Sequence, residues 1–188
     1  KSVPAELLVR LVDAANQAPS GSNMQTARWI VITDDQVKKG LADLNRKGVE
    51  SYIGPQKSRL DAVAHQSKEK RSRMLDAVIW QTEHMHEMPA IIMACIDFGS
   101  PADAAKRAHG GGSIWPGVQN LLLAARALGL GATPTTLALG DHQAISEVLS
   151  LPDTMAAYCL IPVGYPLGRF GPVSRKPVEE IMRWNQWS

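Results

Sequence analysis

Hydrophobic and polar residues alternate along this chain in blocks whose spacing predicts both helices and strands. Residues 4–18 predict an amphipathic helix, because their apolar positions recur at i, i+1, i+4, i+5 and i+8 (Leu7, Leu8, Leu11, Val12 and Ala15). Three runs rich in apolar residues predict strands: Arg28–Thr33, Ala90–Phe98 and Ala157–Gly164. The run 90–98 is apolar almost throughout, which is typical of a strand buried on both faces. Helices and strands alternate, so we expect an α+β or α/β sandwich.

The segment from Ile114 to Leu128 predicts a helix that is apolar nearly all round. Val118, Leu121, Leu122 and Ala125 form one stripe, and the opposite face carries Leu123, Ala124 and Ala127. Such a helix must be buried on both sides, and in a chain this short that takes a second subunit. We therefore expect a homodimer. Ser113 is expected to cap this helix, and Gly129 to end it.

Polar and turn residues bound the remaining elements. In chain order these are a helix from Asp34 or Asp35 to Arg46, a Thr-rich strand or loop over 131–139, a helix capped by Asp141 that runs to Leu149, and a final helix over 177–184. Residues 50–87 form a polar, helix-rich section with little β character. We interpret this section as a lid over a site.

Composition sets the class of protein. The length of 188 residues predicts one domain over 1–188. The net charge of +2 gives no reason to expect a nucleic-acid partner. No apolar stretch reaches the roughly 18 residues of a membrane span, and no signal peptide opens the chain. Cys95 and Cys159 lie in strand-like runs without the spacing of a metal site or redox pair. We expect buried free thiols and a reducing, cytoplasmic compartment.

One stretch is locally basic. Between Lys57 and Asp76 the cations Lys57, Arg59, Lys68, Lys70, Arg71 and Arg73 face only Asp61, Glu69 and Asp76. Two interpretations stay open. The stretch is either a solvated helix face, or a basic rim that attracts a phosphorylated cofactor such as NADPH.

The chemistry of the chain points to a cofactor. It has no phosphate-binding Gly-rich loop with Lys, no His-Glu-x-x-His, no nucleophile elbow and no nucleophile with its base. When acid–base machinery is missing, a bound cofactor often supplies the reaction. The loop 18–25 gathers neutral hydrogen-bonding side chains from Ser20, Ser22, Asn23 and Gln25. Amides both donate and accept, which suits a ligand edge that alternates the two, as a flavin ring does.

Four segments together resemble the FMN-dependent nitroreductase family. They are the Ser-x-x-Asn-x-Gln loop over 20–25, the stretch 129–136, the strand and exit turn 161–166, and the basic loop 168–177. The resemblance covers nearly the whole chain in order, and is closest to the branch with a Gly-Arg-Phe-Gly-Pro tail. It implies a three-layer sandwich with a central mixed sheet flanked by helices, in an intertwined homodimer.

The resemblance also implies which residues bind FMN. Ser20, Asn23 and Gln25 would meet the polar edge of the flavin and its ribityl chain. Pro134, Thr135 and Thr136 would touch the ring, with a main-chain N–H near its N5 atom. Arg175, and Arg169 as a second candidate, would bind the phosphate, because a guanidinium matches phosphate oxygens in a bidentate way. No catalytic side chain and no metal are expected.

The implied function is an oxidoreductase in which NADH or NADPH reduces the flavin and leaves before an electron-poor acceptor binds. Nitroaromatics and quinones are the default acceptors of this ping-pong cycle. Two alternatives stay open: a specialised relative, such as a reductive dehalogenase or a flavin-fragmenting synthase, and a flavin-binding storage or sensing protein without turnover. The physiological acceptor and the choice between NADH and NADPH are not readable from the sequence.

The chain departs from the family pattern at two phosphate-binding positions. The family normally opens with an Arg-Arg-Ser-type motif, whose position would precede Lys1, and some members carry Lys where this chain has Val173. Either the opening segment is missing or phosphate binding is weaker than usual. We favour a missing or disordered terminus.

Overall fold

A four-stranded sheet lies at the centre of the chain and holds the other elements in place. The computed structural model describes residues 1–60, 67–106 and 110–187, with the side chains of 54–60 outside the description. The strands stand in the order β1-β2-β4-β3 and comprise β1 (Ala27–Ile32), β2 (Ala90–Asp97), β3 (Gly131–Ala132) and β4 (Met155–Gly164). The helices are α1 (Ala5–Asn16), α2 (Asp35–Leu60), α3 (Lys68–His84), α4 (Pro101–Ala104), α5 (Trp115–Ala127), α6 (His142–Leu149) and α7 (Val178–Ile181).

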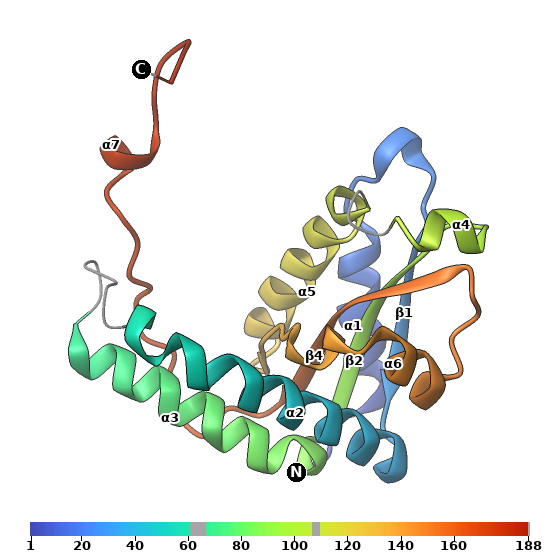
Figure 1. Cartoon of the computed structure of the whole chain (residues 1–188), viewed down its shortest axis with the longest axis horizontal. Helices are drawn as coiled ribbons and strands as arrows, with labels where there is room; N and C mark the ends of the chain where they lie inside the picture. Colours follow the sequence, from blue (N-terminus) through green and yellow to red (C-terminus); the bar gives the residue numbers. More distant parts are fainter. Residues whose placement is uncertain (61–66, 107–109, 188) are drawn as a thin grey trace.

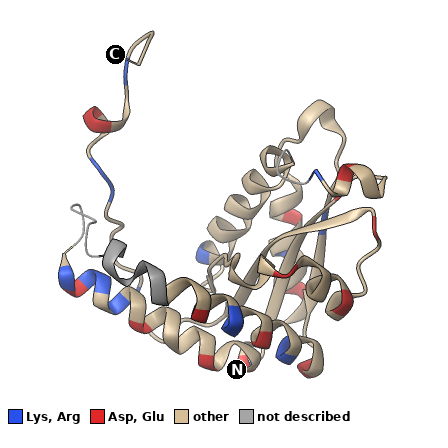
Figure 2. Cartoon of the chain, viewed as in Figure 1, with Lys and Arg blue, Asp and Glu red and all other residues tan. Residues whose placement is uncertain are grey.

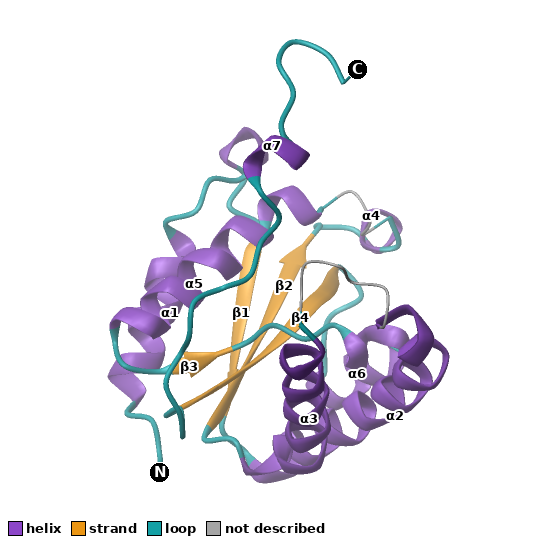
Figure 3. Cartoon of the chain, turned by 90° about the vertical axis from the view of Figure 1, so that its left-hand side faces the viewer, coloured by secondary structure: helices purple, strands orange, loops and turns teal. Residues whose placement is uncertain are grey.

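The sheet is covered on both faces, which makes three layers (Figure 3). Helices α1 and α5 pack on one face, where Leu11 and Leu121 share a core with Ile92 of β2. Helices α2 and α6 cover the other face, where Leu41 and Ile145 share a core with alternate residues of β2. Since β2 is buried from both sides, its side chains are apolar on both faces. This confirms the three-layer sandwich and explains the continuous apolar run.

The expectation of a mixed sheet is wrong for the pairings described within one chain, which are all antiparallel. Trp29 of β1 lies opposite Ala94 of β2, and Ala94 lies opposite Cys159 of β4. The connection from β1 to β2 contains two helices: α2 runs away from the sheet and α3 runs back beside it (Figure 1). The chain therefore re-enters the sheet at the end it left, which reverses the strand. An apolar run in the sequence predicts that a strand is buried, but it does not predict whether the strand is parallel or antiparallel to its neighbours.

Most helix boundaries follow the expected capping chemistry. The carboxylate of Asp34 accepts hydrogen bonds from the N–H groups of Gln36 and Val37 at 2.9 and 3.0 Å, so it caps α2. Asp141 caps α6 by accepting from the N–H of Ala144 at 3.0 Å. Gly129 follows α5 with a φ of +73°, a conformation that favours glycine.

Three expectations about elements are wrong. Ser113 does not cap α5, which begins at Trp115 without a side-chain cap. Helix α2 continues past Arg46 to Leu60. The final helix is only Val178–Ile181. The stretch 131–139 agrees with the expected strand or loop, since it is mostly irregular, with the two residues of β3, one isolated bridge and a 3-10 turn, η5 (Leu137–Gly140).

The section 50–87 contains the end of α2, all of α3 and a 3-10 turn, η2 (Met85–Glu87). Of the basic stretch within it, Asp61 and the side chains of Lys57 and Arg59 lie outside the described residues. Helix α3 packs along α2 and lies outside the layer that covers the sheet (Figure 1). That position agrees with a lid, which stays an interpretation.

Both cysteines are buried free thiols, as expected. Cys95 on β2 and Cys159 on β4 have no exposed surface and form no disulfide. Desolvation by burial raises the pKa of each thiol to about 12, with a smaller contribution at Cys95 from Cys159. The thiolate is the reactive form, so both groups are inert near neutral pH.

Gly48 lets α2 approach η5, and its replacement gives the first testable prediction. A Cβ on Gly48 would overlap the main-chain carbonyl of Leu137. Alanine in a helix interior usually gains about 0.5–1 kcal/mol over glycine. Here the overlap with Leu137 outweighs that gain, and we expect Gly48→Ala to lower the free energy of unfolding by about 1–3 kcal/mol. Urea denaturation followed by circular dichroism measures this loss.

The matched control is Gly40→Ala on the same helix. There the added methyl meets only the side chain of Val148, at 3.2 Å, and a shift of a few tenths of an ångström relieves the contact. We expect a change close to zero. Equal losses in the two variants would contradict the role given to the Leu137 carbonyl.

Candidate functional site

The polar loop between α1 and β1 has strained backbone. Ser22, Asn23 and Gln25 have φ values of 50°, 52° and 51°, in the left-handed region that side chains other than glycine adopt rarely. Such residues cluster at ligand-binding sites, where the surrounding structure holds them. Ser20 Oγ accepts from the N–H of Gln25 at 3.0 Å, and Gln25 Nε2 donates to Asn23 Oδ1 at 3.3 Å. The structure thus brings together Ser20, Asn23 and Gln25, as the sequence predicts.

The loop is fastened to the N-terminal end of α5. The N–H of Gly21 donates to Ser113 Oγ at 3.1 Å, so Ser113 binds the loop instead of capping α5. Beside this contact lies a hollow of about 20 Å³ whose lining includes Ser20, Gln25 and Trp29. Within the described part of the chain, Nε1 of Trp29 is buried and has no hydrogen-bond partner. A buried N–H without a partner costs about 1–3 kcal/mol, so the wall that β1 contributes to this hollow has an unused donor.

The second predicted group, Pro134, Thr135 and Thr136, follows β3. Thr135 forms an isolated bridge with Leu160 of β4, donating its N–H at 2.8 Å and accepting at 2.9 Å. Its Oγ1 donates to Oδ1 of Asn45, a buried residue of α2, at 3.2 Å. The hydrogen-bonding groups of Thr135 are therefore used within the fold. Pro134 has no N–H, so Thr136 holds the remaining main-chain N–H of the group.

A cleft of about 600 Å³ opens beside this second group. Its lining is mostly apolar and comes from α3 and the η2 end (Ala77, Trp80, Gln81, Met88), from β3 and Thr133, and from 162–170 (Pro162, Gly164, Tyr165, Pro166, Leu167, Phe170). A volume of several hundred Å³ with few polar groups is typical of a small-molecule or cofactor site. A smaller hollow of about 250 Å³ between α4 and α6 contains none of the predicted residues.

Trp80 and Gln81 are the site residues that sequence reasoning missed. Trp80 is 46% exposed and stacks on His84, with ring centroids 4.6 Å apart. The signal that could have identified Trp80 is a large aromatic residue inside an otherwise polar helical section. Tyr165 and Phe170 also line the cleft, and the guanidinium of Arg126 lies 4.4 Å from the centre of the Phe170 ring.

Both predicted phosphate-binding arginines lie on the exposed tail after β4. The tail leaves the body of the molecule and extends away from it (Figure 1). Arg169 is exposed, and Arg175 is exposed with its guanidinium donating to the carbonyl of Ser174 at 2.8 Å. Ser174 Oγ accepts from Nζ of Lys70 at 2.7 Å, which ties this part of the tail to the start of α3. The structure does not bring either arginine to the Ser20 loop of the same chain.

Apart from the two arginines of the tail, the predicted residues thus form two groups near opposite ends of α5. The loop with Ser20 is bonded to Ser113, just before α5, and Gly131 with the cleft follows directly after it. The 13 residues of α5 span about 20 Å at 1.5 Å per residue. One chain by itself holds the two groups apart.

Among the described residues, no helix is long and apolar enough to cross a membrane. In the same ranges, no three or more His, Cys, Asp or Glu side chains gather where they could hold a metal ion.

Comparison with known proteins places the chain among redox proteins. The model of the nitroreductase family matches residues 1–165. The chain is 26% identical over 183 residues to an iodotyrosine deiodinase of Thermotoga neapolitana, covering 97% of this chain and 87% of that protein. It is 29% identical over 186 residues to an NADH dehydrogenase of Thermus thermophilus, covering 97% and 86%.

Solved structures agree with this placement. An iodotyrosine deiodinase bound to FMN and 3-iodo-L-tyrosine has a TM-score of 0.71 at 25% identity, covering 100% of this chain and 91% of that one. The NADPH:FMN oxidoreductase from Vibrio harveyi complexed with NAD⁺ has a TM-score of 0.73 at 18% identity, covering 100% and 71%. The second likeness is one of fold alone.

Proposed function

The chain belongs to the nitroreductase family, and from this premise we propose that it is an FMN-dependent oxidoreductase. In this proposal NADH or NADPH is the reductant, and nitroaromatic or quinone-like compounds are the acceptors, in a ping-pong sequence. The observation that supports it most is the apolar cleft of about 600 Å³ beside residues 133–136, with Trp80 and Gln81 on its wall.

The residues present fit FMN. The cleft offers flat apolar and aromatic surface from Trp80, Tyr165 and Phe170, which suits an aromatic ring system. The loop with Ser20, Asn23 and Gln25 offers neutral donors and acceptors for the polar edge of the ring and its ribityl chain. The unpartnered Nε1 of Trp29, on β1 beside this loop, is a further donor that supports the assignment. The exposed guanidinium groups of Arg169 and Arg175 are available for a phosphate.

A second copy of the chain would complete the site. The outer face of α5 carries Trp115, Gln119, Leu123 and Ala127 in one i, i+4 row, and Leu123 is 60% exposed. A twofold partner that packs this row antiparallel on its own copy would place the Ser20 loop of one chain beside Pro134–Thr136 of the other. Apolar side chains of the tail are also exposed in one chain, with Leu167 at 95% and Trp184 at 81%, and a second copy of the chain would bury them.

In the assembled site the work of the protein is binding and orientation. FMN, when bound, supplies the ring that accepts and returns a hydride equivalent. The cleft walls exclude water and present the ring to reductant and acceptor in turn. Among the described residues, the lining holds no carboxylate, Lys, Arg or His, so protons are expected to come from water or from ribityl hydroxyls.

Absorption spectroscopy of the purified protein tests this function. We expect a yellow protein with flavin bands, which NADPH or NADH bleaches without oxygen and a nitroaromatic acceptor restores. Rapid bleaching would also exclude a storage protein without turnover. A colourless preparation that takes up no added FMN would contradict the proposal.

Reductive dehalogenation is the second candidate, because two of the similar proteins are iodotyrosine deiodinases. The same spectroscopic assay separates the two functions. Reoxidation of the reduced protein by 3-iodo-L-tyrosine with iodide release, faster than by a nitroaromatic or quinone, would favour the second candidate.

A further inference from the structure

One face of α3 carries both the wall of the cleft and a pair of cations. Ala77, Trp80 and Gln81 line the cleft. Lys70 and Arg73 precede Ala77 by seven and four residues, and positions separated by three, four or seven lie on the same side of a helix. At 1.5 Å per residue, Arg73 lies about 10 Å and Lys70 about 15 Å along the axis from Trp80. A basic surface therefore lies on the same side of α3 as the cleft wall, toward the start of the helix.

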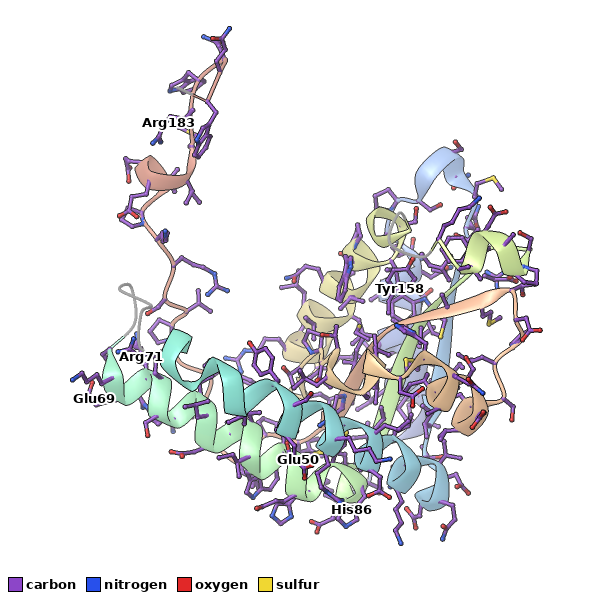
Figure 4. All side chains as sticks on the ribbon, in the orientation of Figure 1. Glu50, Glu69, Arg71, His86, Tyr158 and Arg183 are labelled. Carbon is purple, nitrogen blue, oxygen red and sulfur yellow. The ribbon has the colours of Figure 1, made fainter. Side chains whose placement is uncertain are left out.

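The tail adds two cations to this surface. The bond from Lys70 Nζ to Ser174 Oγ, at 2.7 Å, holds the tail against α3 just before Arg175 and Lys176. We call Lys70, Arg73, Arg175 and Lys176 the basic surface; basic residues appear both at the start of α3 and on the tail in Figure 2. Figure 4 shows the neighbouring Glu69 and Arg71 at the same outer end of α3.

Acidic neighbours reduce this positive charge without cancelling it. Glu69 stands four residues before Arg73, and Asp76 three residues after it. A backbone hydrogen bond and the Ser67 hydroxyl lower the pKa of Glu69, with smaller contributions from Arg73 and Arg71, so Glu69 is ionised near neutral pH. The four cations of the basic surface still outnumber these two carboxylates.

We propose that Lys70 and Arg73 bind the 2′-phosphate of NADPH, so that the protein prefers NADPH to NADH. This inference rests on the proposed function, since it assumes that the nicotinamide end of the reductant enters the cleft beside Trp80. A dinucleotide that starts there and runs along α3 carries its far phosphate over the two cations. An ammonium and a guanidinium are the groups that bind such a phosphate.

The place of Lys70 and Arg73 on α3, on the same side as the cleft wall, favours the reductant over FMN as the source of the phosphate. The reductant must leave in every cycle of a ping-pong enzyme, and exposed cations make weak, reversible contacts. Both residues also lie on the outer helix α3, whereas the residues assigned to FMN lie on the loop, after β3 and on the tail.

Calorimetric titration of the FMN-loaded protein with NADP⁺ and with NAD⁺ tests the proposal without turnover. We expect the double variant Lys70→Gln/Arg73→Gln to raise the Kd for NADP⁺ by about tenfold, or about 1.4 kcal/mol. The Kd for NAD⁺ should stay unchanged. The matched control is Lys68→Gln, which removes the same charge from the same helix, two residues and therefore about 200° round from Lys70.

A second measurement needs no variant. Salt shortens the range of exposed charges, from about 10 Å at 0.1 M to about 3 Å at 1 M. The preference of the wild-type protein for NADP⁺ over NAD⁺ should therefore shrink between these salt concentrations.

The flavin absorbance of each sample separates the possible failures. Protein that binds no FMN would refute the proposed function, and this inference with it. Yellow protein that binds NADP⁺ and NAD⁺ equally would overturn the inference alone. A double variant that loses FMN instead of NADP⁺ affinity would also overturn it, by assigning Lys70 and Arg73 to the phosphate of FMN.

Discussion

Replacing Arg175 by alanine is expected to weaken FMN binding by about tenfold to 150-fold. A charge-assisted hydrogen bond contributes about 1.5–3 kcal/mol, which corresponds to that range of affinity. In the structure the guanidinium of Arg175 is exposed and donates to the neighbouring carbonyl of Ser174. It can therefore turn toward a phosphate without breaking the core. Fluorescence titration of the apoprotein with FMN measures the change in Kd.

Arg183→Ala is the matched control on the same tail. Arg183 lies farther out (Figure 4), donates to the carbonyls of Glu179 and Met182, and its guanidinium stacks 4.9 Å from the ring centre of Trp187. FMN affinity should not change there. An unchanged Kd in Arg175→Ala, with a loss in Arg169→Ala, would move the phosphate contact to Arg169.

Much of the fold was predictable because the burial of one or both faces of an element requires a matching pattern of apolar residues in the sequence. The run 90–98 is apolar on both faces of β2 since helices cover both, and Asp34 and Asp141 cap helices by local bonds that need no tertiary context. Strand direction does not affect the apolar pattern and was therefore not predictable from it. Neither was the extent of α2, whose second half is polar and continues on contacts with α3.

The candidate site was predictable only where it is contiguous. Ser20, Asn23 and Gln25 lie within six positions, and local hydrogen bonds join them. Trp80 and Gln81 reach the cleft because α3 folds back over the end of β4, and nothing in their own segment records that approach. The side chain of Thr135 is bound to Asn45, ninety residues earlier in the chain, which spacing alone does not reveal.

The outward face of α5 with Leu123, Ala124 and Ala127 was predicted to be apolar and covered, and in one chain Leu123 and Ala127 are exposed. The expectation of burial on both sides is met on the inner side, where Val118, Leu121 and Ala125 are buried, whereas Leu123 is 60% exposed. This is the face that we propose the second copy covers. The two groups of site residues lie at opposite ends of the same helix, so assembly and FMN binding should depend on each other.

Leu123→Glu is therefore expected to abolish both the dimer and FMN binding. Burying one leucine contributes about 1.5–3 kcal/mol, and twofold symmetry counts it twice, so the dimer should weaken by about 10²- to 10⁴-fold. The two new carboxylates would also face each other across the interface. Because Leu123 is exposed in one chain, the variant should fold, with an unchanged circular dichroism spectrum. Light scattering and flavin absorbance on the same sample measure mass and bound FMN.

Ile79→Glu is the control for an added surface charge, since Ile79 is 46% exposed on α3 and lies outside the α5 row. It should remain a yellow dimer. If Leu123→Glu is a folded monomer that keeps its FMN, the site is complete within one chain and the composite arrangement is wrong. If it stays a yellow dimer, the copies meet through another surface, and the exposed tail after β4 becomes the next face to test.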